Sequence, residues 1–253
     1  MNDHYLETRD LCKYFGGLKA LEHVDFAVKK NQLKAIIGPN GAGKTTFFNL
    51  LSGTYSPTKG EIYFEGIDIT KKGIHEISRM GLTRTFQITH MFPRLTVFEN
   101  IRIAAQSRKT TFNFLGRAGA IDDVNRRALE ALEQVKLAKV RNHKASTLSH
   151  GERRYLQIGI ALATNPKILL LDEPTAGMSP AETREATELL REVKEKLSLT
   201  IILVEHDMSV VMGICDEVVV LHEGEVLAEG TPQEISDHEL VQRVYLGERS
   251  AEC

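Results

Sequence analysis

Residues 38–45 read GPNGAGKT, and they directly follow the apolar run of residues 35–37. The string matches the pattern G-x-x-x-x-G-K-[ST], which requires a strand before the loop and a helix after it. The apolar run predicts that strand, and residues 44–52 predict the helix, which Gly53 ends. The sequence therefore predicts a strand, a phosphate-binding loop and a helix, in that order.

The residues of this loop suit a bound polyphosphate. Glycines can adopt backbone angles closed to other residues, so successive N–H groups can turn toward the anion, and the positive end of the following helix favours it. Lys44 supplies a positive charge to the β- and γ-phosphates, and Thr45 supplies a hydroxyl to Mg²⁺. The predicted nucleotide-binding residues are Gly38, Pro39, Asn40, Gly41, Ala42, Gly43, Lys44, Thr45 and Thr46. The loop alone leaves kinases, GTPases and motor ATPases open.

Composition predicts a globular chain. The 253 residues are 42% hydrophobic and 26% charged. A chain of this length and composition can bury the core of one large domain or of two small ones. The formal net charge is -2 and there is no long basic block, so we expect no nucleic-acid partner. No segment has the pattern of a signal peptide or approaches the ~20 apolar residues of a membrane-spanning helix. We therefore expect any function at a membrane to depend on partner proteins.

The cysteines point away from disulfides and zinc. Cys12, Cys215 and Cys253 are scattered and lack C-x-x-C spacing. Such spacing is expected of reduced thiols in a cytoplasmic protein, not of a disulfide framework or a zinc site.

Hydrophobic periodicity predicts an α/β protein. Residues 5–28 and 61–64 are short, β-like and bounded by turns, which predicts a small antiparallel sheet. Helices are expected at residues 97–107, 121–137 and 151–164. Farther along, apolar strands at 168–171, 200–204 and 217–221 alternate with helices at 180–197, 208–214 and 235–244. This alternation predicts a parallel sheet covered on both faces.

Two acidic residues follow the strand predicted at residues 168–171. Asp172 and Glu173 emerge at its carboxyl end, where α/β sheets place ligands. Asp172 is a candidate metal ligand, and Glu173 is a candidate base that orients and deprotonates the attacking water. A strand that simply ends in solvated acids remains the alternative.

Four motifs together resemble those of the ATP-binding cassette (ABC) ATPases. They are the loop at residues 38–45, LSHGE at 148–152, DEPT at 172–175, and EHD at 205–207 after a strand. They are similar to the Walker A, signature, Walker B and switch-histidine motifs. The resemblance implies a P-loop NTPase core with a parallel sheet, a small antiparallel β subdomain and an inserted helical subdomain. It implies one domain, 1–253, with 1–87 and 166–253 forming the core and β subdomain and 88–165 the helical signature subdomain.

The resemblance also implies roles for single residues. Ser149 and Gly151 would contact the ATP held by a partner subunit, in a head-to-tail dimer with two ATP molecules. Gln87 would be the Q-loop glutamine, a catalytic residue and metal ligand that couples the site to the membrane partner. His206 would contact the γ-phosphate, and Phe15 would stack on adenine.

Several of these roles have a simpler alternative, and His206 could be an ordinary surface histidine. Ser149 with Glu152 also forms an S-x-x-E capping box, and the two readings are compatible. Tyr14 could take the place of Phe15, which could also be an ordinary core aromatic. The chain departs from the usual family pattern at His150, Glu152 and Ser179. These departures leave open the rate of ATP hydrolysis and the coupling between the two subunits of the dimer.

A finer resemblance lies in GLTRTFQ at residues 81–87, AGMSPAET at 176–183 and VYLGE at 244–248. These strings resemble the ATPase subunits of branched-chain amino-acid importers, with urea importers and the lipopolysaccharide-export ATPase as near relatives. The resemblance implies an energy-coupling ATPase with ATP and Mg²⁺ as cofactors. It implies a second, identical or different, ATPase subunit, integral membrane permease subunits and, indirectly, a solute-binding protein as partners.

The implied location is peripheral, at the cytoplasmic face of the membrane. A soluble ABC protein of translation or DNA repair is a different class, and the single cassette with its short helical insert argues against it. A P-loop kinase would lack the signature at residues 148–152.

Overall fold

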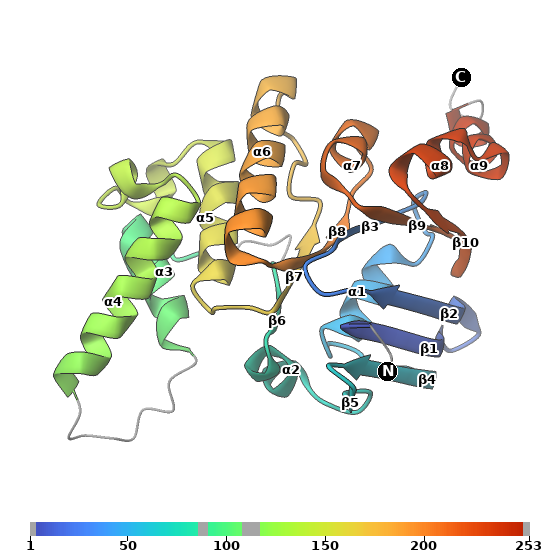
Figure 1. Ribbon diagram of the computed structural model, residues 1–253, viewed down its shortest axis with the longest axis horizontal. Coiled ribbons are helices and arrows are strands. Elements are labelled where there is room, and N and C mark those ends of the chain that lie inside the picture. The colour runs from blue at the N-terminus through green and yellow to red at the C-terminus, as the bar shows by residue number, and fades with distance from the viewer. Residues whose placement is uncertain (1–3, 86–90, 108–116, 250–253) are drawn as a thin grey trace.

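A computed structural model describes residues 4–85, 91–107 and 117–249 of the chain. Its centre is a six-stranded sheet in the order β10-β9-β3-β8-β7-β6 (Figure 1). The pairs from β9 to β6 are parallel, and β10 is an antiparallel edge strand. The strands are β3 Leu33–Ile37, β6 Leu82–Arg84, β7 Ile168–Asp172, β8 Thr200–Val204, β9 Glu217–His222 and β10 Glu225–Gly230. The prediction of a parallel sheet is confirmed.

A second, antiparallel sheet covers one face of this sheet together with the helix α1, Lys44–Leu51 (Figure 1). Its order is β2-β1-β4-β5. Its strands are β1 Leu6–Phe15, β2 Leu18–Val28, β4 Lys59–Phe64 and β5 Ile67–Asp68. Alternate residues of the central strands, such as Leu170 and Ile202, are buried in this layer. The predicted small antiparallel sheet is therefore confirmed.

Helices cover the other face. Leu169, Leu171 and Ile201 pack in one core cluster with residues of α3, α4, α5 and α6. Val218 and Val220 pack in another with residues of α7, α8 and α9. The first group comprises α3 Val97–Gln106, α4 Arg117–Gln134, α5 His150–Leu162 and α6 Pro180–Leu197, and the second α7 Met208–Ile214, α8 Pro232–Asp237 and α9 Glu239–Arg249. Because both faces are buried, the central strands are apolar throughout.

Three parts of the secondary structure differ from the prediction. The single helix expected at residues 235–244 is wrong, because His238 has extended backbone angles and separates α8 from α9. The strands β5, β6 and β10 and the helix α2, Ile74–Met80, have no predicted counterpart. These strands are edges of their sheets, β5 and β6 are only two and three residues long, no residue of β10 is buried, and α2 buries only Ile77. Edge elements with little burial carry a weak hydrophobic pattern.

The remaining regular elements are short helices near α5. They are the 3-10 helices Ala138–Val140 and Ala145–Thr147. Across the described ranges, no helix combines the length and apolar character needed to cross a membrane. The division of the chain at residues 87/88 and 165/166 stays a prediction.

Candidate functional site

The glycine-rich loop joins β3 to α1 and packs closely against neighbouring backbone. Gly38 has φ 149°, and a Cβ there would lie 2.1 Å from the carbonyl oxygen of Leu221. Gly43 has φ 100°, and a Cβ there would lie 2.7 Å from the carbonyl oxygen of Ala20. Neither position can accept a side chain without moving backbone. The loop conformation is therefore held by β9 and β2 as well as by its own sequence.

A cavity of about 510 Å³ opens beside this loop, within the 300–1,000 Å³ typical of small-molecule sites. Of the predicted nucleotide-binding set, seven loop residues and Phe15 line it, together with the predicted base Glu173. The lining residues are Phe15, Leu18, Lys19, Ala20, Asn40, Gly41, Ala42, Gly43, Lys44, Thr45, Thr46, Glu173, Glu223 and Gly224. The cavity thus joins two motifs that lie far apart in the sequence.

Lys44 holds its ammonium group over the loop. Its Nζ donates hydrogen bonds to the carbonyl oxygens of Gly38, at 2.5 Å, and of Pro39, at 2.8 Å. Gly38 and Pro39 are themselves buried and do not line the cavity. These two residues therefore shape the loop and position Lys44.

Phe15 lies at the rim of the cavity and is 42% exposed. Its ring meets Tyr55 edge-on, with 5.5 Å between the ring centroids. The alternative that Phe15 is a core aromatic is therefore wrong. Tyr14 does not line the cavity, and its hydroxyl donates a hydrogen bond to Glu22. Of the two aromatic residues, Phe15 is the one that a flat ring in the cavity could contact.

Glu173 stands where β7 leaves the sheet, in a strained backbone conformation. Its φ is 47°, and its N–H donates to the carbonyl oxygen of Val204 on β8. Non-glycine residues in the left-handed region cost ~1–3 kcal/mol and cluster at functional sites. Nδ1 of His206 lies 3.9 Å from Oε1 of Glu173. The ends of β7 and β8 thus place the predicted base beside the predicted switch histidine.

Asp172 is buried and has a partner that the sequence analysis missed. Its Oδ2 accepts a hydrogen bond from the Arg84 guanidinium at 2.8 Å, and Arg84 also donates to Oδ1 of Asn49 at 2.6 Å. The Arg84 and Asp172 side chains are only 7% and 5% exposed. Arg84 therefore fixes the orientation of the predicted metal ligand. Its position at the end of β6, parallel to β7, could have indicated this contact had β6 been predicted.

Glu205, a second missed residue, connects the loop after β7 to the loop after β8. Its carboxylate is fully buried and accepts hydrogen bonds from both the N–H and the hydroxyl of Thr175. It also accepts from the N–H groups of His206 and Asp207. A buried carboxylate with several donors is an anchor. Glu205 therefore holds His206 in register with the segment that follows Glu173.

We expect Glu205→Ala to lower the free energy of unfolding by about 2–4 kcal/mol, because several buried donors lose their acceptor. Glu205→Gln keeps one amide oxygen and should cost less. Urea denaturation of the two variants and the wild type measures the difference. Equal stability of Glu205→Ala and the wild type would show that the anchor contributes nothing.

Ser149 and Gly151 lie at the start of α5, and neither lines the cavity. The predicted capping box is confirmed. The Ser149 hydroxyl accepts from the N–H of Glu152 at 3.2 Å, and the Glu152 carboxylate accepts from the N–H of Ser149 at 2.8 Å. Ser149 is exposed, so this helix start faces solvent in the single chain. The Glu152 carboxylate therefore interacts with the N–H of Ser149 at the start of its own helix.

The segment around Ser179 packs beside this helix start. A Cβ on Gly177 would lie 3.4 Å from the His150 ring, and one on Gly151 would lie 3.5 Å from the Glu182 carboxylate. Ser179 caps α6 by accepting from the N–H of Glu182. The hydrogen bonds from Ser179, with a smaller contribution from His150, lower the pKa of Glu182. Ser179 and His150 therefore belong to one exposed surface.

The turn between β9 and β10 is a part of the site that the sequence analysis did not find. Glu223 and Gly224 both have positive φ, and both line the cavity. The N–H of Gly224 donates to the carbonyl oxygen of Ala42, and the N–H of Glu22 donates to that of Gly224. An acidic residue and a glycine between two β-like runs are a hairpin signal. That signal could have located the turn.

The structure does not test the prediction for Gln87, which lies outside the described residues.

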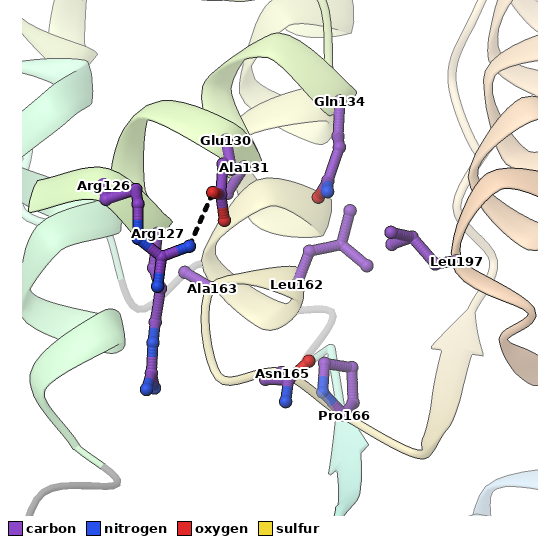
Figure 2. A pocket seen from close by; sticks show the side chains of 10 residues that line it. All are labelled: Arg126, Arg127, Glu130, Ala131, Gln134, Leu162, Ala163, Asn165, Pro166 and Leu197. Atoms are coloured by element: carbon purple, nitrogen blue, oxygen red, sulfur yellow. Dashed lines mark hydrogen bonds and ion pairs between the residues drawn. The ribbon is translucent and has the colours of Figure 1, made fainter. Parts of the chain in front are cut away.

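A separate hollow of about 340 Å³ lies between the ends of α4, α5 and α6 and shares no residue with the cavity (Figure 2). Figure 2 shows the ion pair of Arg126 and Glu130 at its edge. None of the predicted site residues lines this hollow.

Comparisons with known proteins agree with the motifs. Residues 21–176 match the family model described as "ABC transporter". Residues 225–251 match one described as "Branched-chain amino acid ATP-binding cassette transporter". The chain is 42% identical over 255 residues to the high-affinity branched-chain amino acid transport ATP-binding protein BraF of Pseudomonas aeruginosa. That alignment covers 98% of this chain and 100% of the relative.

Solved structures are similar over almost the same length. A nucleotide-free ATP-binding cassette from an ABC transporter is 34% identical with a TM-score of 0.84, covering 96% of this chain and 98% of that one. A dimeric post-hydrolysis state of an ATP-binding cassette bound to ADP and Pi is 28% identical with a TM-score of 0.76. It covers 90% of this chain and 98% of that one.

Proposed function

The chain belongs to the ABC transporter family as an ATP-binding ATPase cassette, and from that premise we propose which residues hydrolyse ATP and what the hydrolysis drives. The observation that carries the proposal is the cavity shared by Lys44 of the glycine-rich loop and Glu173 of β7. A phosphate-binding loop and a carboxylate base at one cavity are the parts that phosphoryl transfer to water needs.

The residues present suit MgATP. The cavity has the volume for a nucleotide, Phe15 offers an exposed ring at one end, and Lys44 lies at the loop. Thr45, Asp172 and Gln87 carry oxygen atoms, the donors that Mg²⁺ prefers. Bound Mg²⁺ would neutralise charge on the β- and γ-phosphates.

Glu173 orients the attacking water and takes its proton. Glu173 has a strained backbone and lines the cavity, and its side chain is 29% exposed. His206 contacts the γ-phosphate from the end of β8 and is positioned by the Glu205 anchor. These roles require both loops to hold their places while the nucleotide reacts.

Catalysis requires a head-to-tail dimer in which Ser149 and Gly151 complete the partner's site. Two observations support this arrangement. Ser149 and His150 at the signature helix start are exposed, and neither Ser149 nor Gly151 lines the cavity of its own chain. A similar cassette has been solved as a dimer with ADP and Pi. The capping box uses the N–H groups of Ser149 and Glu152, which leaves those of His150 and Gly151 for a phosphate.

The ATPase drives import of branched-chain or related amino acids through integral membrane permease subunits, at the cytoplasmic face of the membrane. Support comes from the relative BraF and from the match of residues 225–251. A solute-binding protein would deliver the solute to the permease. Urea import and lipopolysaccharide-type export are the alternative transport functions that the same ATPase could drive.

The test is solute uptake in the producing organism. Deleting the gene should abolish uptake of radiolabelled leucine, isoleucine and valine, and the wild-type gene should restore it. Lys44→Ala should not restore uptake, because loss of a charge-assisted bond of ~1.5–3 kcal/mol weakens ATP binding by about 10–100-fold. Calorimetric titration of the purified variant measures that affinity.

Lys71→Ala, an exposed lysine outside the cavity, is the matched control and should restore uptake fully. If the deletion strain takes up amino acids normally but loses urea uptake, the transported solute is urea and not a branched-chain amino acid. Unchanged ATP affinity of Lys44→Ala would show that the glycine-rich loop is not the nucleotide site.

A further inference from the structure

Three potential metal-ligating side chains meet in the antiparallel sheet, away from the nucleotide cavity. Asp10 and Cys12 lie on β1 and His23 lies on β2. One ligand atom from each residue lies within 4.8 Å of the other two. Oδ1 of Asp10 and Nδ1 of His23 are in direct hydrogen-bond contact. None of the three residues lines the cavity beside the glycine-rich loop.

An irregular stretch of the β1–β2 ladder brings the three residues together. The register shifts between Thr8 and Leu11 and again between Leu11 and Lys13. Asp10 and His23 both have positive φ, 50° and 51°. The N–H of Asp10 donates to the Asp25 carboxylate, which holds the bulge. Bulges redirect side chains, and here they direct those of Asp10 and His23 toward each other.

The Cys12 thiol lies at the buried base of the group. The residue is fully buried, and its Sγ accepts a hydrogen bond from the N–H of His23 at 3.4 Å. Its S–H donates to the carbonyl oxygen of Asp10 at 3.5 Å. An N–H group directed at sulfur is an outer partner of the kind that orients a metal ligand.

The charges around the group favour a cation. The Asp10 carboxylate places a negative charge in direct contact with the His23 ring. His23 and Asp10 have side chains that are 65% and 63% exposed, so solvent reaches them and they can rotate.

We propose that Asp10, Cys12 and His23 form a binding site for one Zn²⁺ ion, with water as the fourth ligand. Thiolate, imidazole and carboxylate are the ligands that Zn²⁺ takes in tetrahedral geometry. With bonds of about 2.0–2.3 Å, tetrahedral ligand atoms lie roughly 3.5 Å apart. Rotation of the two exposed side chains would widen the direct contact between Asp10 and His23 and shorten the longer separations, which are at most 4.8 Å. The ion replaces the proton shared by Asp10 and His23 and the proton of the Cys12 thiol.

This site differs chemically from the predicted magnesium site. Thr45, Asp172 and Gln87 offer oxygen atoms alone, whereas a thiolate and an imidazole select a softer ion. Zn²⁺ would link β1 to β2 three residues before Phe15, which lies at the rim of the cavity. Ion binding to the folded chain alone would also raise its thermal stability.

The test uses the untagged full chain without nucleotide, after removal of metals with a chelator, because ATP itself binds divalent ions. Titration of Zn²⁺ in competition with a chromophoric chelator should give one ion per chain. Co²⁺ in place of Zn²⁺ should give thiolate-to-metal charge-transfer absorption and the intense visible bands of tetrahedral coordination.

Cys12→Ser and His23→Asn should each lower the Zn²⁺ affinity by about 100-fold or more, since even an outer-shell partner is worth 10–100-fold. Cys12→Ser should also abolish the charge-transfer absorption. Asparagine tolerates the left-handed backbone at position 23. Cys215→Ser is the matched control and should bind Zn²⁺ as the wild type does.

The proposal is overturned if the wild type binds no stoichiometric Zn²⁺ or if Cys12→Ser and His23→Asn bind it normally. It is also overturned if Cys215→Ser removes the site. Circular dichroism of the metal-free proteins verifies folding. Should Cys12→Ser not fold, His23→Asn and Asp10→Asn decide the question, because both residues are exposed.

Discussion

Glu173→Gln is expected to bind MgATP almost as the wild type does and to lower turnover by about 10²–10⁴-fold. The amide keeps the shape of the carboxylate but cannot take a proton from water. We propose that hydrolysis reopens the dimer, so the variant should also accumulate as an ATP-bound dimer. Steady-state ATPase rates and gel filtration with MgATP measure the two effects.

Glu188→Gln is the matched control for this variant. Glu188 is an exposed α6 residue paired with Arg191, and it does not line the nucleotide cavity. Its turnover should equal that of the wild type. Near-normal activity of Glu173→Gln would remove Glu173 from the role of base and would leave its strained backbone without a functional explanation.

Ser149→Arg is expected to lower turnover by about 10²-fold or more while leaving ATP binding to the monomer almost intact. Ser149 is exposed and lies outside the cavity of its own chain, so the larger side chain should not disturb nucleotide binding there. In the dimer the arginine would occupy the place of the partner's phosphate and prevent closure. Calorimetry on the monomer and ATPase rates at dimer-forming concentration measure the difference.

Mixing this variant with Lys44→Ala tests the arrangement directly. In the mixed dimer one interface carries both defects, and the other pairs an intact loop with an intact signature. Activity should rise above the sum of the two parents if one intact site suffices. Crosslinking must first show that the subunits exchange, because the two sites could have to act together.

Loss of ATP binding in a demonstrably monomeric Ser149→Arg sample would refute the shared site, since it would place the signature in its own chain's pocket. Thr147→Arg is a matched control, because Thr147 is an exposed residue two positions away that lies outside the capping box. The two variants place the same charge and bulk in neighbouring positions. A difference between them therefore reports on the phosphate contact.

Much of the fold followed from local pattern. The central strands were predictable because both of their faces are buried, so that residues such as Leu169 and Leu170 are apolar in succession. The start of α5 was predictable because Ser149 and Glu152, three residues apart, each accept a hydrogen bond from the other's N–H group. The edge strands were not predicted because little of them is buried, although the turn before β10 carries a hairpin signal. No local signal marks the break at His238.

The candidate site, like the fold, has one part that the local sequence determines and another that it does not. Residues 38–45 form a phosphate-binding loop within one continuous stretch, so the sequence by itself determined the loop and the place of Lys44 in it. The sequence also determined the order of motifs that identifies the family. Glycines, capping residues and apolar runs act over short separations, and their effects can be read from neighbours in the chain.

Only the tertiary structure decided which distant groups meet. It paired Arg84 with Asp172 across 88 positions and Glu205 with Thr175 across 30. It also brought the scattered Cys12, for which no zinc site was expected, together with His23 and Asp10. The physical reason is that such contacts depend on strand order and register, and a small shift in either separates groups that must lie within hydrogen-bonding or metal-binding distance.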